Sequence, residues 1–394
     1  DIKSQSLLGI MYHNGEGIPK DYKEAMKWFR KAADQGDVGS QYFLGMMYRN
    51  GEGIPQDYKE AIKWFRKAAD QGDIKSQSFL GIMYRNGDGI PQDYKEAMKW
   101  FRKAADQGDV GSQYFLGIMY RNGEGIPQDY KEAIKWFRKA ADQGDIKSQS
   151  LLGIMYHNGE GVPQDYKEAM KWFRKAADQG DVGSQYFLGI MYRNGEGIPQ
   201  DYKEAIKWFR KAADQGDIKS QSLLGIMYHN GEGIPKDYKE AIKWLRNAAD
   251  QGDFRGQFFL GAMYYEGEGV PQDYKEAMKW FRKAADQGDV GGQSLLGIMY
   301  RNGDGIPQDY KEAIKWFRKA ADQGDFRGQY FLGIMYRYGE GIPQDYIKAH
   351  FWLNLAASQG FQKAGLERDD LSKKMSRHQI DQAQELARNW KPIK

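Results

Sequence analysis

The chain has 394 residues, no cysteine, and a net charge of +4 from 58 basic and 54 acidic residues. The missing cysteines exclude a disulfide framework and any thiolate metal site. The near balance of charge excludes a long-range field of one sign, which a dedicated polyanion binder would carry. No run of 18 or more apolar residues is present that could span a bilayer.

A unit of 36 residues recurs ten times along the chain. Such a fixed period predicts one repeat array rather than the two or three domains that the length alone suggests. The array is expected over 1–360, followed by a different segment, 361–394. The expected units are 1–36, 37–72, 73–108, 109–144, 145–180, 181–216, 217–252, 253–288, 289–324 and 325–360.

Each unit predicts two helices, of which the first runs from Val38 to Asn50 in the second copy. Gly45 lies in the middle of this helix, where glycine costs about 1 kcal/mol relative to alanine. The same glycine occurs in all ten copies. We therefore expect two helices to approach closely there, with alanines such as Ala68 giving room on the partner helix.

A turn and a second helix follow the first one. Gly51, Gly53 and Pro55 predict the turn, because glycine supplies positive φ and proline cannot extend a helix. Asp57, followed three residues later by Glu60, predicts a capping box at the start of the second helix. The second helix then shows apolar residues on one arc and charged residues on the other, and a glycine that can end a helix closes the unit.

Helices of this length are marginal alone, so the units are expected to stack on one another. The pattern that carries the unit resembles the Sel-one-like repeat, a relative of the tetratricopeptide repeat, and this resemblance covers residues 1–360. It implies an all-α, right-handed α-solenoid of ten 36-residue helix-turn-helix repeats. In the second copy the pattern is carried by Gln41, Leu44, Gly45, Tyr48, Gly51, Gly53, Ile54, Asp57, Ala61, Trp64, Ala68, Ala69 and Gly72.

The last unit predicts a C-terminal helical cap. Ile347, Phe351 and Leu355 stand where other copies have lysines, so something must cover them. Helices are expected over 361–375 and 377–390, and Ser376 with Gln379 predicts a capping box for the second of them. The first unit has no such cap, so we expect either that further residues precede it or that this end meets another chain. Self-association through this N-terminal repeat is the corresponding prediction.

The special residues point away from catalysis. The forty glycines at positions 9, 15, 17 and 36 of the unit recur with the repeat, and the others are accounted for, so none remains for a phosphate loop. His13, His157 and His229 occupy one position in separate copies, too far apart to share a metal ion. No catalytic residue, metal or cofactor is expected, and the chain is predicted not to be an enzyme.

The binding surface is predicted from the positions of the first helix that differ between copies. Positions 2, 3, 6, 7, 10 and 13 form one continuous arc, which the resemblance places on the concave groove of a solenoid. Residues in this arc alternate with a 72-residue period, which either duplication or function explains. The candidate partner-binding residues are Tyr42, Arg49, Tyr114, Arg121, Tyr186, Arg193, Arg255, Phe258, Tyr265, Arg327, Tyr330, Arg337 and Tyr338, which include arginines and aromatics typical of interface hot spots.

We therefore hypothesise a bacterial protein-binding scaffold or adaptor that takes an acidic or extended polypeptide in this groove. One alternative is a nucleic-acid or polyanion binder, using the same groove or the basic stripe of Lys23, Lys27, Arg30 and Lys31 on the second helix. Another is a cell-wall-linked enzyme that resembles cysteine-rich relatives connected with β-lactams, although those cysteines and a Ser-x-x-Lys motif are missing. The chain begins at Asp1 rather than methionine, which leaves the cytoplasm and an exported location both open.

Overall fold

The computed structural model describes residues 1–393 and contains 22 helices, with no strand among those residues. The predicted all-α solenoid of helix-turn-helix repeats is confirmed. The first helices of the ten repeats are α1 (Ile2–Asn14), α3 (Val38–Asn50), α5 (Ile74–Asn86), α7 (Val110–Asn122), α9 (Ile146–Asn158), α11 (Val182–Asn194), α13 (Ile218–Asn230), α15 (Phe254–Glu266), α17 (Val290–Asn302) and α19 (Phe326–Tyr338).

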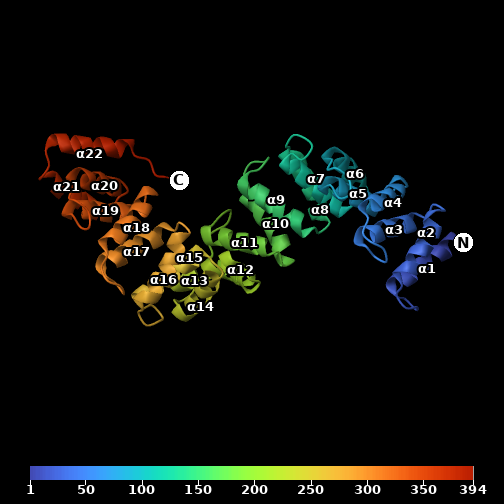
Figure 1. The fold of residues 1–394 in the computed structure, drawn as a ribbon, viewed down its shortest axis with the longest axis horizontal. Coiled ribbons are helices and arrows are strands. Elements are labelled where there is room, and N and C mark those ends of the chain that lie inside the picture. Colours follow the sequence, from blue (N-terminus) through green and yellow to red (C-terminus); the bar gives the residue numbers. More distant parts are fainter. Residues whose placement is uncertain (394) are drawn as a thin grey trace. The chain divides into compact units, whose positions relative to one another are not determined.

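The second helices are α2 (Tyr22–Ala33), α4 (Tyr58–Asp70), α6 (Tyr94–Asp106), α8 (Tyr130–Asp142), α10 (Tyr166–Asp178), α12 (Tyr202–Asp214), α14 (Tyr238–Asp250), α16 (Tyr274–Asp286), α18 (Tyr310–Asp322) and α20 (Tyr346–Ser358). Two further helices follow, α21 (Gln362–Ser372) and α22 (Arg377–Asn389). Figure 1 shows successive helix pairs side by side, for example α3 and α4 beside α1 and α2.

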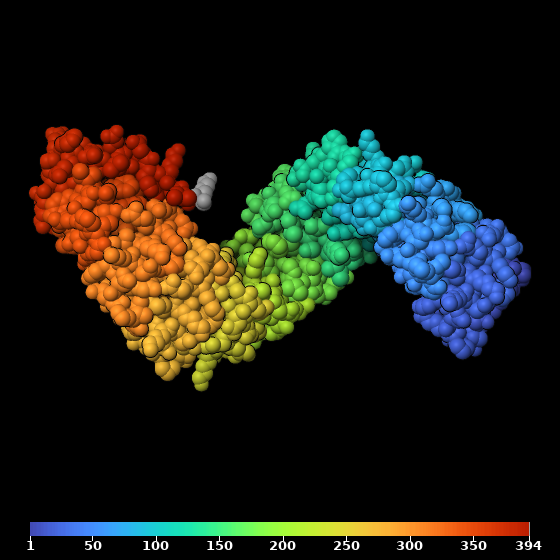
Figure 2. Space-filling view, viewed as in Figure 1, coloured from blue at the N-terminus to red at the C-terminus, as the bar shows by residue number. Residues whose placement is uncertain are grey.

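Contacts between residues divide the chain into two compact parts, which from here on are called the first and second units, while the 36-residue elements are called repeats. One comprises Asp1–Met191 with Gly195–Pro199, and the other Tyr192–Asn194 with Gln200–Lys394. Within each unit a second helix packs on the first helix of its own repeat and on the first helix of the next. The space-filling view shows the same succession, because atoms of neighbouring repeats within a unit form a continuous surface (Figure 2).

The turn between the two helices forms as the glycines predict. Gly51 and Gly53 have φ of 74° and 73°, a region that residues with a side chain rarely adopt. A Cβ at Gly53 would also lie 2.7 Å from the Cβ of Tyr22 in the preceding repeat. These glycines therefore serve both the turn and the stacking of one repeat on another.

The predicted capping box of the second helix is only half correct. Asp57 accepts a hydrogen bond from the backbone N–H of Glu60 at 3.0 Å, but Glu60 forms an ion pair with Lys63 instead of reaching back. The reason lies in the turn, where the backbone N–H of Asp57 already donates to the carbonyl of Tyr48 at 2.8 Å. The glutamate is not needed as its acceptor.

The core lies between the two helices of each repeat and the helices of its neighbours. Leu44, Met47 and Phe65 are fully buried, and Trp64 is 4% exposed. Burying one such large side chain stabilises the fold by about 1.5–3 kcal/mol. A short helix that is marginal alone is thus held by its neighbours in the stack.

The central glycine of the first helix has a different partner from the one predicted. A Cβ on Gly45 would lie 2.6 Å from the ring of Phe65, which packs flat against the glycine. The close approach is therefore correct, but a phenylalanine rather than the alanines fills the space.

Helices α21 and α22 both pack on α20, as the apolar residues of the last repeat predict. Leu355 is buried in one cluster with Ala364 and Leu371 of α21, and Phe351 packs against the same cluster. The predicted capping box of α22 is complete, with Ser376 and Gln379 each bonding the other's backbone N–H. Helices α21 and α22 therefore lie at the C-terminal end of the repeat array, which is drawn in red in Figure 2.

The cap contains one buried histidine, from which a pH dependence follows. His350 is 2% exposed, and its Nδ1 has no hydrogen-bond partner among residues 1–393. Burial lowers the pKa of His350 below 6.5, and the charge of Arg368 lowers it further, while Asp369 acts in the opposite direction. In other copies this position holds isoleucine or methionine.

We expect the cap to lose stability as the pH falls below about 6.5, because the unfolded chain then binds a proton that folded His350 resists. The loss of stability continues until the pH reaches the pKa of His350 in the folded protein. Hydrogen exchange of α20–α22 at pH 7.5 and 5 measures the effect, and His350→Ile should flatten the difference. An unchanged difference in that variant would show that other groups cause it.

Candidate functional site

Position 13 of the first helix bridges neighbouring repeats. Arg85 donates from Nε to Glu124 Oε2 at 2.7 Å and from Nη2 to Glu124 Oε1 at 3.0 Å, and this hydrogen bonding lowers the pKa of Glu124. His13 lies 2.8 Å from Glu52 in the same arrangement. The equivalent bridges join Arg121 to Glu160, Arg193 to Glu232, Arg301 to Glu340, His157 to Glu196, His229 to Glu268 and Tyr265 to Asp304.

These bridges engage Arg121, Arg193 and Tyr265, three of the predicted binding residues, between repeats. Burial raises the pKa of Tyr265, and hydrogen bonding to Asp304 adds to this effect. Arg49 differs, since its guanidinium lies 5.0 Å from the centre of the Phe79 ring and its Nε is buried without a hydrogen-bond partner. The acid that follows it, Asp88, has a shorter side chain than the glutamates of other bridges.

Arg337, another of the predicted binding residues, holds the cap. Its side chain is 6% exposed and forms ion pairs with Glu367 and Asp370 of α21. It also donates to the backbone carbonyl of Glu367 at 2.9 Å. Helix α21 thus supplies the carboxylates that, in the bridges within the array, come from the next repeat.

Position 6 sets the character of each junction between repeats. Where it is serine, the hydroxyl can bond across the junction: Ser6 donates to Asp37 at 3.0 Å and accepts from Ser40 at 3.0 Å, whereas the hydroxyl of Ser222 is buried without a hydrogen-bond partner among residues 1–393. Position 3 of the following repeat is glycine after three of the five serines, as in Gly39, and arginine after Ser222 and Ser294. We call Ser6–Gly39, Ser78–Gly111 and Ser150–Gly183 the Ser junctions. The first helices meet directly at two of them, α1 with α3 and α5 with α7.

At Tyr42 and Tyr114, which are at position 6, a pocket opens instead. Tyr42 and Lys75 of the next repeat line a pocket of about 480 Å³, with the ammonium 5.6 Å from the ring centre. Tyr114 and Lys147 line a second one of about 490 Å³, with the corresponding distance at 5.8 Å. Phenylalanines beside the tyrosines and the start of the following helix complete both linings.

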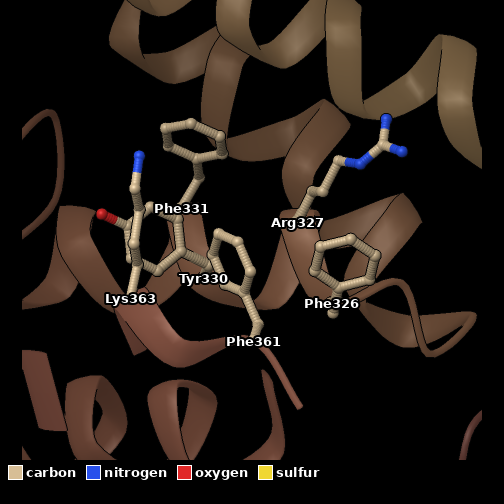
Figure 3. Close-up of a pocket in the computed structure, with 6 residues that line it drawn as sticks. All are labelled: Phe326, Arg327, Tyr330, Phe331, Phe361 and Lys363. Carbon is tan, nitrogen blue, oxygen red and sulfur yellow. The ribbon is translucent and has the colours of Figure 1, made fainter. Parts of the chain in front are cut away.

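A third pocket of about 530 Å³ lies between the last repeat and the cap. Tyr330 and Lys363 correspond to the tyrosine and the lysine of the other two pockets. Tyr330 is at position 6 of the last repeat, and Lys363 would be at position 3 if a further repeat began at residue 361. The Phe361 ring lies 5.1 Å from that of Tyr330. Figure 3 shows Lys363 and Arg327 on opposite sides of the aromatic rings. We call Tyr42–Lys75, Tyr114–Lys147 and Tyr330–Lys363 the Tyr junctions.

Burial raises the pKa of the Tyr42 and Tyr330 hydroxyls, with the charges of Asp73 and Glu367 adding to the effect. These phenols stay neutral near pH 7. They can offer a hydrogen bond and an aromatic face, but no negative charge.

The other predicted residues are spread along the first helices. Arg255 and Arg327 are exposed and lie near the rings of Phe254 and Phe326, while Tyr338 is 57% exposed. Tyr186 is half-buried and lies against Phe187, with ring centres 5.6 Å apart. Phe258 fills the space above Gly291, where a Cβ would lie 2.7 Å from its ring. Arg327 and Tyr330, both of the predicted set, line one pocket together.

The basic stripe of the second helix is largely engaged locally. Lys27 pairs with Glu24 at 3.1 Å, Lys31 lies over Trp28 at 4.4 Å, and Arg30 donates to the hydroxyl of Tyr48 at 2.6 Å. Such pairing favours a solvated structural face over a polyanion site.

The lysines of the Tyr junctions and Phe361 are not among the residues that the sequence predicts to bind a partner. The signal was present in the spacing, because Lys75 and Lys147 each follow a position-6 tyrosine by 33 residues, and Lys363 follows Tyr330 by the same interval. Residues 361–363 had been assigned to the cap, so their place in the repeat count was not considered.

The described part of the chain shows no grouping of three or more His, Asp or Glu side chains able to hold a metal ion. Among residues 1–393, no helix is long and apolar enough to cross a membrane. The fold and these surfaces define a repeat scaffold of the tetratricopeptide-like class, built from stacked helix pairs that present pockets along their first helices.

The chain belongs to the Sel1 repeat family. The family model for the Sel1 repeat matches ten times, at residues 2–37, 38–73, 74–109, 110–145, 146–181, 182–217, 218–253, 255–289, 291–325 and 327–361. Sel1 repeat proteins bind proteins and are generally non-catalytic interaction scaffolds. A search of the curated proteins finds no match.

Two solved structures are similar to it. The first is c5321, a protective antigen present in uropathogenic Escherichia coli strains that displays an SLR fold. It is 37% identical, with 98% of this chain and 91% of that chain covered and a TM-score of 0.71. The second is a Sel1 repeat protein from Oxalobacter formigenes, 36% identical, with 78% and 89% covered and a TM-score of 0.63.

Proposed function

We propose that the chain is a scaffold that binds an extended polypeptide along its first helices. The observation that carries this proposal is the recurrence of one pocket type at the Tyr junctions. A tyrosine, a phenylalanine and a lysine line each of them, and aromatic rings with a cation are typical components of protein-interaction sites. An enzyme would have one specialised site, whereas these pockets repeat with the array.

The capture of a partner from bacterial lysate tests this proposal. The intact chain is compared with a variant carrying Tyr42→Ser, Tyr114→Ser and Tyr330→Ser, which places at position 6 the residue of the Ser junctions. A control variant carries Lys63→Gln, Lys135→Gln and Lys207→Gln on the exposed face of the second helices.

We expect a protein to be retained by the intact chain and by the control, and at least tenfold less by the tyrosine variant. Equal capture by all three would contradict a site at the Tyr junctions. Recovery of mainly nucleic acid, lost steeply with salt, would favour the polyanion alternative.

Self-association through the first repeat stays a prediction. Ile2 and Leu7 of this repeat are 36% and 58% exposed. We expect an oligomer by light scattering that Leu7→Lys converts to a monomer. A monomeric mass for the unmodified chain would contradict it.

A further inference from the structure

The alternation between Ser and Tyr junctions gives the array a spacing of two repeats. In the first unit, the pockets of Tyr42 and Tyr114 are separated by the Ser junction of Ser78 and Gly111. At this intervening junction α5 and α7 are in direct contact, and Ser112 donates to Ser78 at 3.1 Å. Pockets therefore occur at every second junction here, with a closed junction between them.

The pockets share one chemistry. Their inner walls are aromatic and aliphatic: Tyr114, Phe115 and Ile146 line one, and Tyr42, Phe43 and Ile74 line the other. Such walls suit an apolar side chain, and volumes near 500 Å³ are within the range of small-ligand pockets. A purely charged ligand would leave these walls without a partner.

The rim of each pocket carries an exposed cation. Lys75, Lys147 and Lys363 are exposed, and within residues 1–393 none of them takes part in an ion pair. The arginines at position 13, by contrast, are mostly matched by acids of the next repeat. The acids at the start of the following helices, Asp73 and Asp145, are engaged as N-caps, accepting from Ser76 and Ser148 at 2.7 Å. Lys75 and Lys147 are the cations left for a ligand at their pockets, and at the third pocket Arg327 is exposed beside Lys363.

We propose that the Tyr junctions bind an acidic polypeptide that places an apolar side chain in each pocket and a neighbouring carboxylate on its lysine. This inference rests on the proposed function and names the chemistry of the partner. Adjacent helices pack at about 8–10 Å, so two repeats separate pockets of the first unit by roughly 20 Å. An extended chain advances at most about 3.3–3.6 Å per residue, so the anchors must be at least about six residues apart.

The polypeptide is favoured over a small anionic molecule because the same pocket recurs. One small molecule would fill one pocket, whereas a polypeptide with spaced anchors can fill two pockets at once. After the first anchor has bound, the second anchor is present at a high effective concentration near its own pocket, which strengthens binding. It is favoured over nucleic acid because only one lysine stands on each rim in the first unit, while the rest of the lining there is largely apolar.

Binding of labelled peptides to the full chain tests this inference. The probe carries two Asp-Phe-Asp anchors joined by eight Gly and Ser residues, and fluorescence anisotropy measures its Kd. Matched peptides replace one Phe by Ala, both Phe by Ala, or all Asp by Lys.

The protein variants are Tyr114→Ser, Lys75→Gly with Lys147→Gly, and the control Lys95→Ser with Lys131→Ser, which removes the same charge from the second helices. Serine and glycine already occupy these first-helix positions at the Ser junctions, so the variants are expected to fold. Circular dichroism melting checks this.

We expect the two-anchor peptide to bind at least tenfold more tightly than the one-anchor peptide. Tyr114→Ser should abolish that advantage, and the Lys→Gly pair should weaken binding at least fivefold while the control leaves it unchanged. Equal binding of the peptide that lacks both phenylalanines, or of the lysine peptide, would overturn the proposed chemistry. Absence of binding to any peptide would overturn it as well, but the lysate capture, which uses natural partners, would still report on the scaffold function.

Discussion

Replacing Gly117 by alanine should destabilise its repeat by about 2–3 kcal/mol, although alanine is the better helix former. A Cβ at this position would lie 2.5 Å from two ring carbons of Phe137, which is fully buried. Neither the ring nor the helix has free space to move into, so the clash must be relieved by separating α7 from α8. Hydrogen exchange of these two helices should accelerate by about 30- to 150-fold, since 1.4 kcal/mol is a factor of ten.

The same helix supplies the matched control. A Cβ at Gly111 would meet only Asp109 Oδ2, at 3.5 Å, so Gly111→Ala should be neutral or stabilising by up to about 1 kcal/mol. Both variants make one identical change in α7. Equal melting temperatures for the two variants would show that the Phe137 ring is not the reason why glycine is required at position 117.

Replacing Arg337 by methionine should loosen the cap by about 2 kcal/mol. The guanidinium is buried and holds Glu367 and Asp370, so its removal leaves two acids of α21 without their cation. The cost is below that of a fully buried pair, because Asp370 is 51% exposed. We expect α21 and α22 to exchange amide hydrogens about 30-fold faster, while repeats distant from the cap keep their protection.

Arg121→Met is the matched control for the cap variant. Arg121 and Glu160 are 27% and 22% exposed and form the internal version of this bridge, which we expect to contribute at most about 1 kcal/mol. If Arg337→Met left the cap as protected as in the unmodified chain, the bridge would not be what holds α21.

Much of the fold could be predicted because the same repeat recurs. The expected first helix, Val38–Asn50, has the same bounds in the structure. The expected turn glycines, Gly51 and Gly53, have positive φ. Ten copies of one pattern reveal which positions are constrained. Helix caps and turn glycines depend only on residues a few positions away, so the sequence itself shows them.

The errors concern partners that are distant in the sequence. Variation at position 13 was interpreted as freedom from packing, but arginine, histidine and tyrosine can all donate to a carboxylate 39 residues further on. The residue type varies while the bridge remains. Gly45 was matched with alanines because the spacing identifies a helix face, but not which side chain of the other helix fills it.

The residues of the Tyr junctions could be proposed only in part from the sequence, for the same reason. The tyrosines of position 6 are among the predicted binding residues, since they alternate visibly along the chain. Their lysines lie in the next repeat, and Lys363 lies in the cap, so the pairs emerge only when neighbouring repeats are placed together.

Photo-cross-linking tests most directly whether a polypeptide binds at the Tyr junctions. Benzoylphenylalanine is placed at position 39 or 111, where glycines line two pockets, or at position 131 on an exposed face of a second helix, and each protein is irradiated in bacterial lysate. We predict a cross-linked polypeptide from positions 39 and 111, mapped to a segment with acidic and apolar residues, and little from position 131. Cross-links of equal yield at all three positions, or only at 131, would contradict it.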